Sequence, residues 1–169
     1  MGEVEKIILT ACATLAGGVI LLVLTELVKS FIMSPVQDLK KQVQVVLSKV
    51  DFHCNMLTNY FSAKPSDDEL VNIRTIKKDL REAATDLKSK YTMIPYKKIL
   101  SDLRFIPSLE EIDVAYGGLI YLHNSILYEG RRDFVINTIE MNHNRIDRIH
   151  GALTHSEIPP IVNPKEKTR

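Results

Sequence analysis

The chain has few cysteines and none of the common catalytic motifs. It has no tryptophan and two cysteines among 169 residues. Cys12 and Cys54 form neither a disulfide framework nor a zinc-binding set, which fits a reducing compartment. A glycine-rich phosphate loop, a His-Glu-x-x-His motif and a Gly-x-Ser-x-Gly motif are all missing. We therefore nominate no catalytic residue, and expect a protein that is not an enzyme and uses no cofactor.

An excess of charge of either sign is also missing. The 22 lysines and arginines nearly balance the 21 aspartates and glutamates, which leaves a net charge of +1. A nucleic-acid-binding domain usually carries a broad basic surface. The composition therefore does not indicate binding to DNA or long RNA.

What the chain does have is a long uncharged run near its start. Residues 7–25 contain no charged side chain, and as a helix at about 1.5 Å per residue they span roughly the 30 Å hydrocarbon core of a bilayer. A secretory signal peptide would need a basic start and a shorter apolar stretch, whereas this run follows Glu3 and Glu5. The run predicts a transmembrane helix that stays in the mature protein.

The flanking charges predict the orientation of this span. Four lysines follow it closely: Lys29, Lys40, Lys41 and Lys49. Because lysine and arginine favour the cytoplasmic side, the N-terminus should lie outside and the rest of the chain in the cytoplasm.

The span also carries small residues four positions apart. Ala13 precedes Gly17 at this spacing, and Thr14 precedes Gly18. This pattern fits self-association of spans into an oligomer, although small residues are frequent in membrane helices generally.

The segment after the span is predicted to be a long amphipathic helix. Ser34 followed by Pro35 is typical of an N-cap and a first helical position. Apolar positions then recur every three or four residues: Val36, Leu39, Val43, Val46, Val50, His53, Leu57 and Tyr60. The pattern fits a parallel coiled coil or a helix on the core of its own domain. Leu47 beside Val46 widens the stripe and favours the second interpretation.

Three further long helices and one short helix are predicted. Capping boxes at Ser66 with Glu69 and at Ser108 with Glu111 begin two of the long ones, and the short one covers about 96–103. The inward positions of the long helices are Leu70, Ile73, Ile76, Leu80, Ala83, Leu87 and Tyr91, then Ile112, Ala115, Leu119, Leu122 and Ile126, then Val135, Ile139, Asn142, Ile146, Ile149 and Leu153. Gly130 is expected to separate the last two.

These elements predict an all-α protein in three parts. Residues 1–33 form the N-terminal segment and transmembrane helix, and residues 34–155 form a cytoplasmic bundle of about four long helices and one short helix. Residues 156–169 contain three prolines and are expected to be a disordered tail.

Amide and basic side chains are the candidates for a ligand site. Asn55 and Asn59 share a face of the first domain helix, and Arg145 and Arg148 lie on the last. Asparagine pairs with adenine and arginine with phosphate, so the four residues suit a nucleotide. The same residue types also serve helix ends and hydrogen bonds between helices.

Two histidine patterns have a functional and a structural interpretation. His143, Asp147 and His150 share a helix face that could hold a metal, but such a face is usually solvated, and we expect no metal site. His53 on the apolar stripe fits a buried residue with one hydrogen-bond partner, or else a sensor of pH or ligand.

A resemblance to known proteins adds an expectation about function. It depends on the uncharged span, the Ser34-Pro35 junction and the stretches Asn55-Met-Leu-Thr-Asn59 and Leu122-His-Asn-Ser125. In layout and size the whole chain resembles small bacterial proteins with one N-terminal span and a helical cytoplasmic domain. It is similar to a membrane effector of type III CRISPR defence. That resemblance implies the bacterial inner membrane, a cyclic oligoadenylate ligand and an oligomer whose membrane span the ligand perturbs.

Two functions are therefore expected from the sequence. The first is an effector of antiviral defence that binds a cyclic nucleotide between cytoplasmic domains of a homo-oligomer and perturbs the span. The second is a constitutive, membrane-tethered protein-interaction module without a small ligand. It would require an exposed apolar groove on the bundle.

Overall fold

The computed structural model describes residues 2–58, 66–125 and 132–161, and over these ranges the chain is helical without strands. Its helices are α1 (Glu3–Val28), α2 (Ser34–Thr58), α3 (Asp67–Thr92), α4 (Lys97–Asp102), α5 (Leu109–Ser125) and α6 (Arg132–Leu153). A π-helical turn, η1 (Lys29–Met33), joins α1 to α2. The predicted all-α class, with four long helices and one short one after the first segment, is confirmed. Asn59, Tyr60, Ile126 and Gly130 lie outside the described residues.

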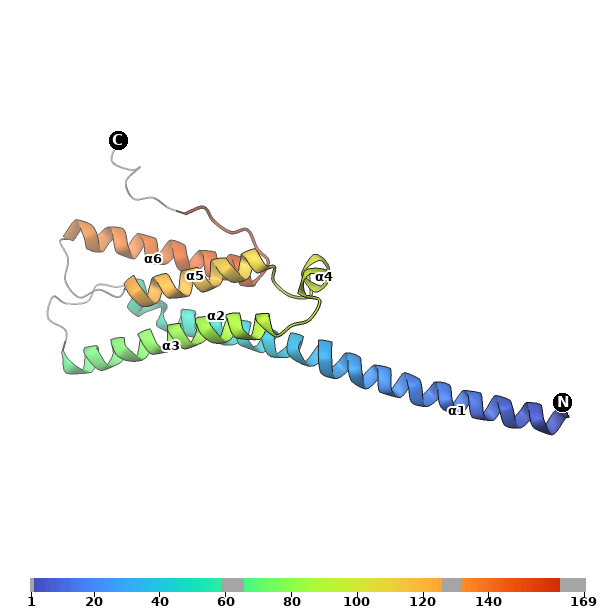
Figure 1. The fold of residues 1–169 in the computed structure, drawn as a ribbon. Helices are drawn as coiled ribbons and strands as arrows, with labels where there is room; N and C mark the ends of the chain where they lie inside the picture. The colour runs from blue at the N-terminus through green and yellow to red at the C-terminus, as the bar shows by residue number, and fades with distance from the viewer. Residues whose placement is uncertain (1, 59–65, 126–131, 162–169) are drawn as a thin grey trace.

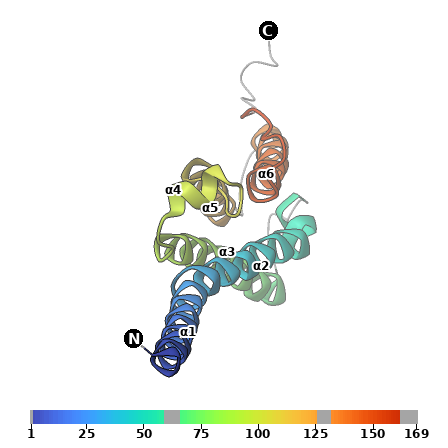
Figure 2. The ribbon, with the colours of Figure 1, turned by 90° about the vertical axis from the view of Figure 1, so that its right-hand side faces the viewer.

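Four helices form the bundle, and they contact one another in a ring. α2 packs on α3, α3 on α5, α5 on α6, and α6 returns to α2. The end-on view in Figure 2 shows this arrangement, with α4 lying over one end of α5. α2, which continues the helix that carries the apolar run, therefore packs on the core of its own domain.

The core is built from the predicted stripes. Apolar residues at most of the predicted positions of α2, α3 and α5 are buried, and so are Ile146, Ile149 and Leu153 of α6. One position of α2 differs, because Gln42 is buried while Val43 is half-buried. Gln42 tolerates this site because its Oε1 accepts a 3.3 Å hydrogen bond from Lys90 Nζ of α3. The α2 stripe therefore packs on the core of its own domain, as the second interpretation predicted.

Two helices begin as the capping boxes predict. Ser66 Oγ accepts from Glu69 N at 3.3 Å, and Glu69 Oε2 accepts from Ser66 N at 2.7 Å. The equivalent pair at the start of α5, Ser108 and Glu111, makes both bonds at 3.1 and 2.6 Å. Each box pairs donors that a helix N-terminus otherwise leaves unsatisfied.

α1 leaves the bundle as a straight rod with no buried residue (Figure 1). Together with η1 and α2 it belongs to one continuous helix, Glu3–Thr58, whose apolar window has a mean hydropathy of 2.6. By length and composition this is a helix that could cross a membrane. A protein core does not explain its apolar surface, since none of that window is buried inside the molecule.

The predicted N-cap at Ser34 is wrong. Ser34 has helical angles of φ −63° and ψ −51°, and its N–H bonds the carbonyl of Lys29 in the π turn. Proline cannot donate to the preceding turn, and its ring clashes with the carbonyl four residues back. The wider π turn before Pro35 lets the helix continue instead of ending.

The end of the chain also differs from the expected tail. Residues 156–161 turn back on α6, where the carbonyl of Glu157 would lie 2.7 Å from a Cβ at Gly151. Asn144 Nδ2 donates to the Pro160 carbonyl at 2.9 Å, and Ile158 packs on the core. Gly151 permits this close approach because it has no side chain. Residues 162–169 lie outside the described part of the chain.

A candidate ligand groove between α5 and α6

Two of the four candidate residues, Arg145 and Arg148, line one groove between α5 and α6. The groove has a volume of about 720 Å³, within the range of small-molecule sites. Its lining residues are Leu109, Glu110, Asp113, Val114, Gly117, Gly118, Tyr121, Arg145 and Arg148. Asn55 is exposed on α2 and does not line the groove, while Asn59 lies outside the described residues.

Two glycines shape the α5 wall of the groove. At Gly118 α5 packs closely on α6, since a Cβ there would lie 2.7 Å from Ile149 Cγ1. Gly117 is different, because a Cβ at that position would meet no atom within 4 Å. Gly117 therefore leaves space in the groove that a side chain would occupy.

Tyr121 and Arg145 face each other across the groove. The guanidinium carbon of Arg145 lies 4.9 Å from the centre of the Tyr121 ring, a cation–π contact. The Tyr121 hydroxyl contacts Met141 Sδ at 3.5 Å. Burial raises the pKa of Tyr121 above 10.0, although the positive charge of Arg145 opposes the shift. The tyrosine is therefore a neutral, oriented ring beside a fixed cation.

Arg148 is held by the end of the chain. Its Nη1 donates to the carbonyl of Pro159, so residues 156–161 help to hold the Arg148 side chain in place. The Nε atom of Arg148 is buried and has no hydrogen-bond partner in the described part of the chain. Because a guanidinium has five N–H donors, Arg148 keeps donors that an acceptor in the groove could use.

Carboxylates occupy the other side of the groove. Asp113 Oδ1 is 3.0 Å from Lys88 Nζ of α3, and that lysine also lies 4.7 Å from the centre of the Tyr116 ring. Glu110 is exposed in the first turn of α5. The groove thus offers two guanidinium groups, one aromatic ring and two carboxylates over a largely apolar wall.

The candidates from the sequence did not include Tyr121, Gly117 or Gly118. A signal existed for the glycines, since a Gly-Gly pair inside a helix lowers its stability and needs a packing reason. Tyr121 gave no comparable signal, because its role depends on which face of α5 meets Arg145 of α6.

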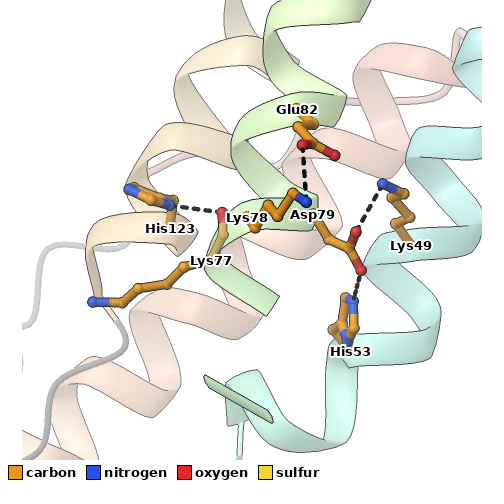
Figure 3. Close-up of polar contacts among 7 residues, drawn as sticks. All are labelled: Lys49, His53, Lys77, Lys78, Asp79, Glu82 and His123. Carbon is orange, nitrogen blue, oxygen red and sulfur yellow. Dashed lines mark hydrogen bonds and ion pairs between the residues drawn. The ribbon is translucent and has the colours of Figure 1, made fainter. Parts of the chain in front are cut away.

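A second polar cluster connects α2 to α3 (Figure 3). The carboxylate of Asp79 lies between Lys49 and His53, with Nζ to Oδ1 and Nε2 to Oδ2 distances of 3.0 Å each. Burial raises the pKa of Asp79, but hydrogen bonds from His53 and Lys49 outweigh it, so the pKa lies below 3.8. His53 is 5% exposed. The predicted buried histidine with a hydrogen-bond partner is confirmed.

Further polar contacts join the groove helices to the rest of the bundle. His123 of α5 places Nδ1 2.9 Å from the Lys77 carbonyl of α3 (Figure 3). His150 of α6 places Nε2 2.9 Å from Asp51 Oδ1 of α2. His150 is two residues from Arg148 on α6. Asp51 lies on α2, which continues through η1 into α1.

The histidine face of α6 does not gather metal ligands. His150 contacts Asp51, and His143 is exposed. Across residues 2–58, 66–125 and 132–161, no group of three or more histidine, cysteine, aspartate or glutamate side chains is placed to hold a metal ion.

The groove is the main structural guide to function, because comparisons with known proteins found no match. No protein-family model, no curated protein and no solved structure matches the chain.

Proposed function

We propose that the chain is a membrane-anchored effector whose helical domain binds a cyclic nucleotide in the α5–α6 groove and perturbs the membrane span of a homo-oligomer. α1 would be the single span, with its N-terminus outside the bacterial inner membrane and the bundle in the cytoplasm. The resemblance described above narrows the role to antiviral defence and the ligand to a cyclic oligoadenylate.

The observation that carries this proposal is the chemistry of the groove. Arg145 and Arg148 offer forked donors for phosphate, and Tyr121 offers an aromatic ring. The carboxylates of Glu110 and Asp113 can accept hydrogen bonds from amino groups of a base. A groove of about 720 Å³ accommodates part of a cyclic oligonucleotide, so neighbouring copies in an oligomer would bind the remainder.

Continuity between the bundle and the span supports the second half of the proposal. Arg148 and His150 share the last two turns of α6, and His150 contacts Asp51 on α2. A ligand that binds one arrangement of α5 and α6 more tightly shifts the bundle toward that arrangement. α2 then carries the change through η1 to α1 without an intervening loop.

Ligand binding is tested with the full chain in lipid nanodiscs. Cyclic di-, tri-, tetra- and hexa-nucleotides are titrated while thermal unfolding is followed; a ligand at 100 times its Kd stabilises by about 2.7 kcal/mol. Arg145→Ala and Gly117→Leu should abolish the shift, the first by removing a cation and the second by filling the groove. Arg74→Ala, on the exposed face of α3, is the matched control.

Dye release from vesicles reports whether the same ligand perturbs the membrane. The proposal predicts release that requires the ligand and disappears in Gly117→Leu. Absence of any thermal shift in folded wild-type protein would refute the ligand. A shift without release would refute the membrane effect alone.

One observation favours the alternative of a constitutive, membrane-tethered interaction module. Val45 and Phe52 are seven residues apart on α2, and they are 43% and 81% exposed. This spacing puts both on one face of the helix, where a partner protein would bury them. Localisation that depends on Phe52 but not on Arg145 would support the module over the nucleotide effector.

A further inference from the structure

Exposed apolar side chains cluster around α4. They comprise Met93 (72% exposed), Tyr96 (70%), Ile99 (57%), Leu103 (61%) and Phe105 (55%), and we call this group the α4 surface. Single exposed apolar residues are ordinary on a soluble domain, but five within thirteen residues are not. Exposed apolar side chains at this density in one short segment point to a binding site.

The α4 surface is held in place by buried residues on both sides. Ile94 and Ile106 are 2% and 1% exposed, and Leu100 is half-buried against the core. Tyr96 and Arg104, which bracket α4, have positive φ angles of 52° and 57°. Such angles are costly for residues with a Cβ, so packing must enforce these turns. The segment is therefore fixed with its apolar side chains outward.

Basic side chains accompany the apolar ones. Lys97 and Lys98 begin α4, and Arg104 follows it, against a single acidic residue, Asp102. Lys97 Nζ donates to the Thr92 carbonyl at 3.2 Å and lies 5.5 Å from the centre of the Tyr91 ring. Aromatic and long apolar side chains mixed with lysine and arginine are the composition of elements that bind at a lipid interface.

The position of α4 points to the same occupant. It lies at the end of the bundle from which α1 leaves (Figure 1). The uncharged run ends at Thr25, and nine residues on, at about 1.5 Å per residue, α2 begins some 14 Å further along the axis. The exposed side chains of Phe31 and Met33 continue the apolar surface across this interval. Because membrane helices tilt by about 20° on average, one side of the bundle end approaches the headgroups.

We propose that the α4 surface binds the cytoplasmic face of an anionic bilayer, with its apolar side chains in the interface and its lysines and arginine against lipid phosphates. This inference depends on the proposed membrane anchoring by α1. It gives the bundle a second lipid contact, separate from the span, which fixes the bundle's orientation relative to the membrane.

The absence of tryptophan from the chain makes a direct test possible. Single Trp reporters are introduced at Phe105 on the α4 surface, at Phe52 on α2 and at Leu15 in the span. Phe52 is a matched aromatic control, since it is 81% exposed and lies about 27 Å along α2 from Ser34 at 1.5 Å per residue. The full-length variants are reconstituted into phosphatidylcholine–phosphatidylglycerol vesicles that contain lipids brominated on their acyl chains, which quench nearby tryptophan.

The proposal predicts quenching and a blue-shifted emission for Phe105→Trp, with neither for Phe52→Trp. Adding Lys98→Gln to Phe105→Trp should weaken the quenching, and pure phosphatidylcholine should weaken it further. If Leu15→Trp is quenched while Phe105→Trp behaves as Phe52→Trp does, α1 anchors the protein and the α4 proposal fails. A blue shift at position 105 without quenching means that protein covers the surface, which also overturns the proposal. If Leu15→Trp is not quenched, membrane anchoring itself fails.

Discussion

Asn142 Nδ2 of α6 donates a 2.8 Å hydrogen bond to the carbonyl of Leu57 in the last turn of α2. Asn142 is 3% exposed, so this bond closes the ring of four helices inside the core. The last carbonyls of a helix have no hydrogen-bond partner within the helix. The Leu57 carbonyl accepts its hydrogen bond from Asn142, a residue much later in the chain.

Asn142→Ala should destabilise the bundle by about 1–3 kcal/mol, because it leaves a buried carbonyl without a donor. Urea unfolding in detergent micelles, followed by far-UV circular dichroism, measures the change. Asn55→Ala is the matched control, since Asn55 is exposed on α2 and its loss should cost less than about 0.5 kcal/mol. Equal midpoints for the two variants would show that the buried bond contributes nothing.

Asp79→Asn should destabilise the protein at neutral pH and have little effect in acid. The pKa of Asp79 is lower in the folded state than the ordinary 3.8, so its carboxylate stabilises the fold above pH 3.8. This contribution disappears as the pH falls through the lowered pKa. Unfolding free energies of wild type and variant, measured between pH 7 and pH 3, should therefore converge at the acidic end. A gap that stays constant with pH would contradict the role of the charge.

The two adjacent glycines of α5 should respond oppositely to alanine. Gly117→Ala meets open space and gains about 0.8–1 kcal/mol of helix propensity. Gly118→Ala places a methyl group 2.7 Å from Ile149 Cγ1 and should cost about 1–3 kcal/mol. A double-mutant cycle of Gly118→Ala with Ile149→Ala should show strong coupling, whereas Gly117→Ala with Ile149→Ala should be additive.

Tyr91→Phe should protect the fold in strong alkali. Burial raises the pKa of Tyr91 above 10.0, and the carboxylates of Asp113 and Glu111 add to the shift. A raised pKa in the folded state means that stability is intact below pH 10 and falls as the pH rises through the higher value. Melting temperatures recorded from pH 9 upward should decline less steeply for the variant. Parallel declines would show that Tyr91 does not contribute.

How much of this architecture could be predicted depended on the range of the interactions involved. The stripes of α3 and the capping boxes at Ser66 and Ser108 depend on neighbours one turn away, and they were predicted correctly. The Ser34 N-cap failed because local rules place proline at a helix start, whereas here a π turn accommodates it.

The candidate site was only half predictable for a related reason. Arg145 and Arg148 are on one helix, so their proximity follows from spacing. Tyr121 meets Arg145 only because α5 packs on α6. Residues 156–161 reach Arg148 only because Gly151, which has no side chain, permits their close approach to α6. Neither contact has a local sequence signal.

Pro35→Ala tests the origin of the π turn. The substitution restores an N–H that can bond the carbonyl four residues back, so the helix should tighten across Lys29–Met33. Hydrogen exchange measured by mass spectrometry should show slower exchange in peptides that cover this turn. Pro95→Ala, before α4, should leave those peptides unchanged. Unaltered exchange in Pro35→Ala would mean that proline does not cause the turn.

The η1 turn also sets the angular phase between the bundle and α1. A π turn holds one more residue than an α turn, and each residue of an α-helix advances the chain by about 100°. Converting η1 to α geometry without removing a residue would therefore turn α1 by roughly a quarter of a revolution relative to α2. The face of α1 that carries Ala13 and Gly17 would then point in a new direction relative to the bundle. A change at this junction reaches α1 chiefly as rotation about its own axis, accompanied by an axial displacement of about 1.5 Å.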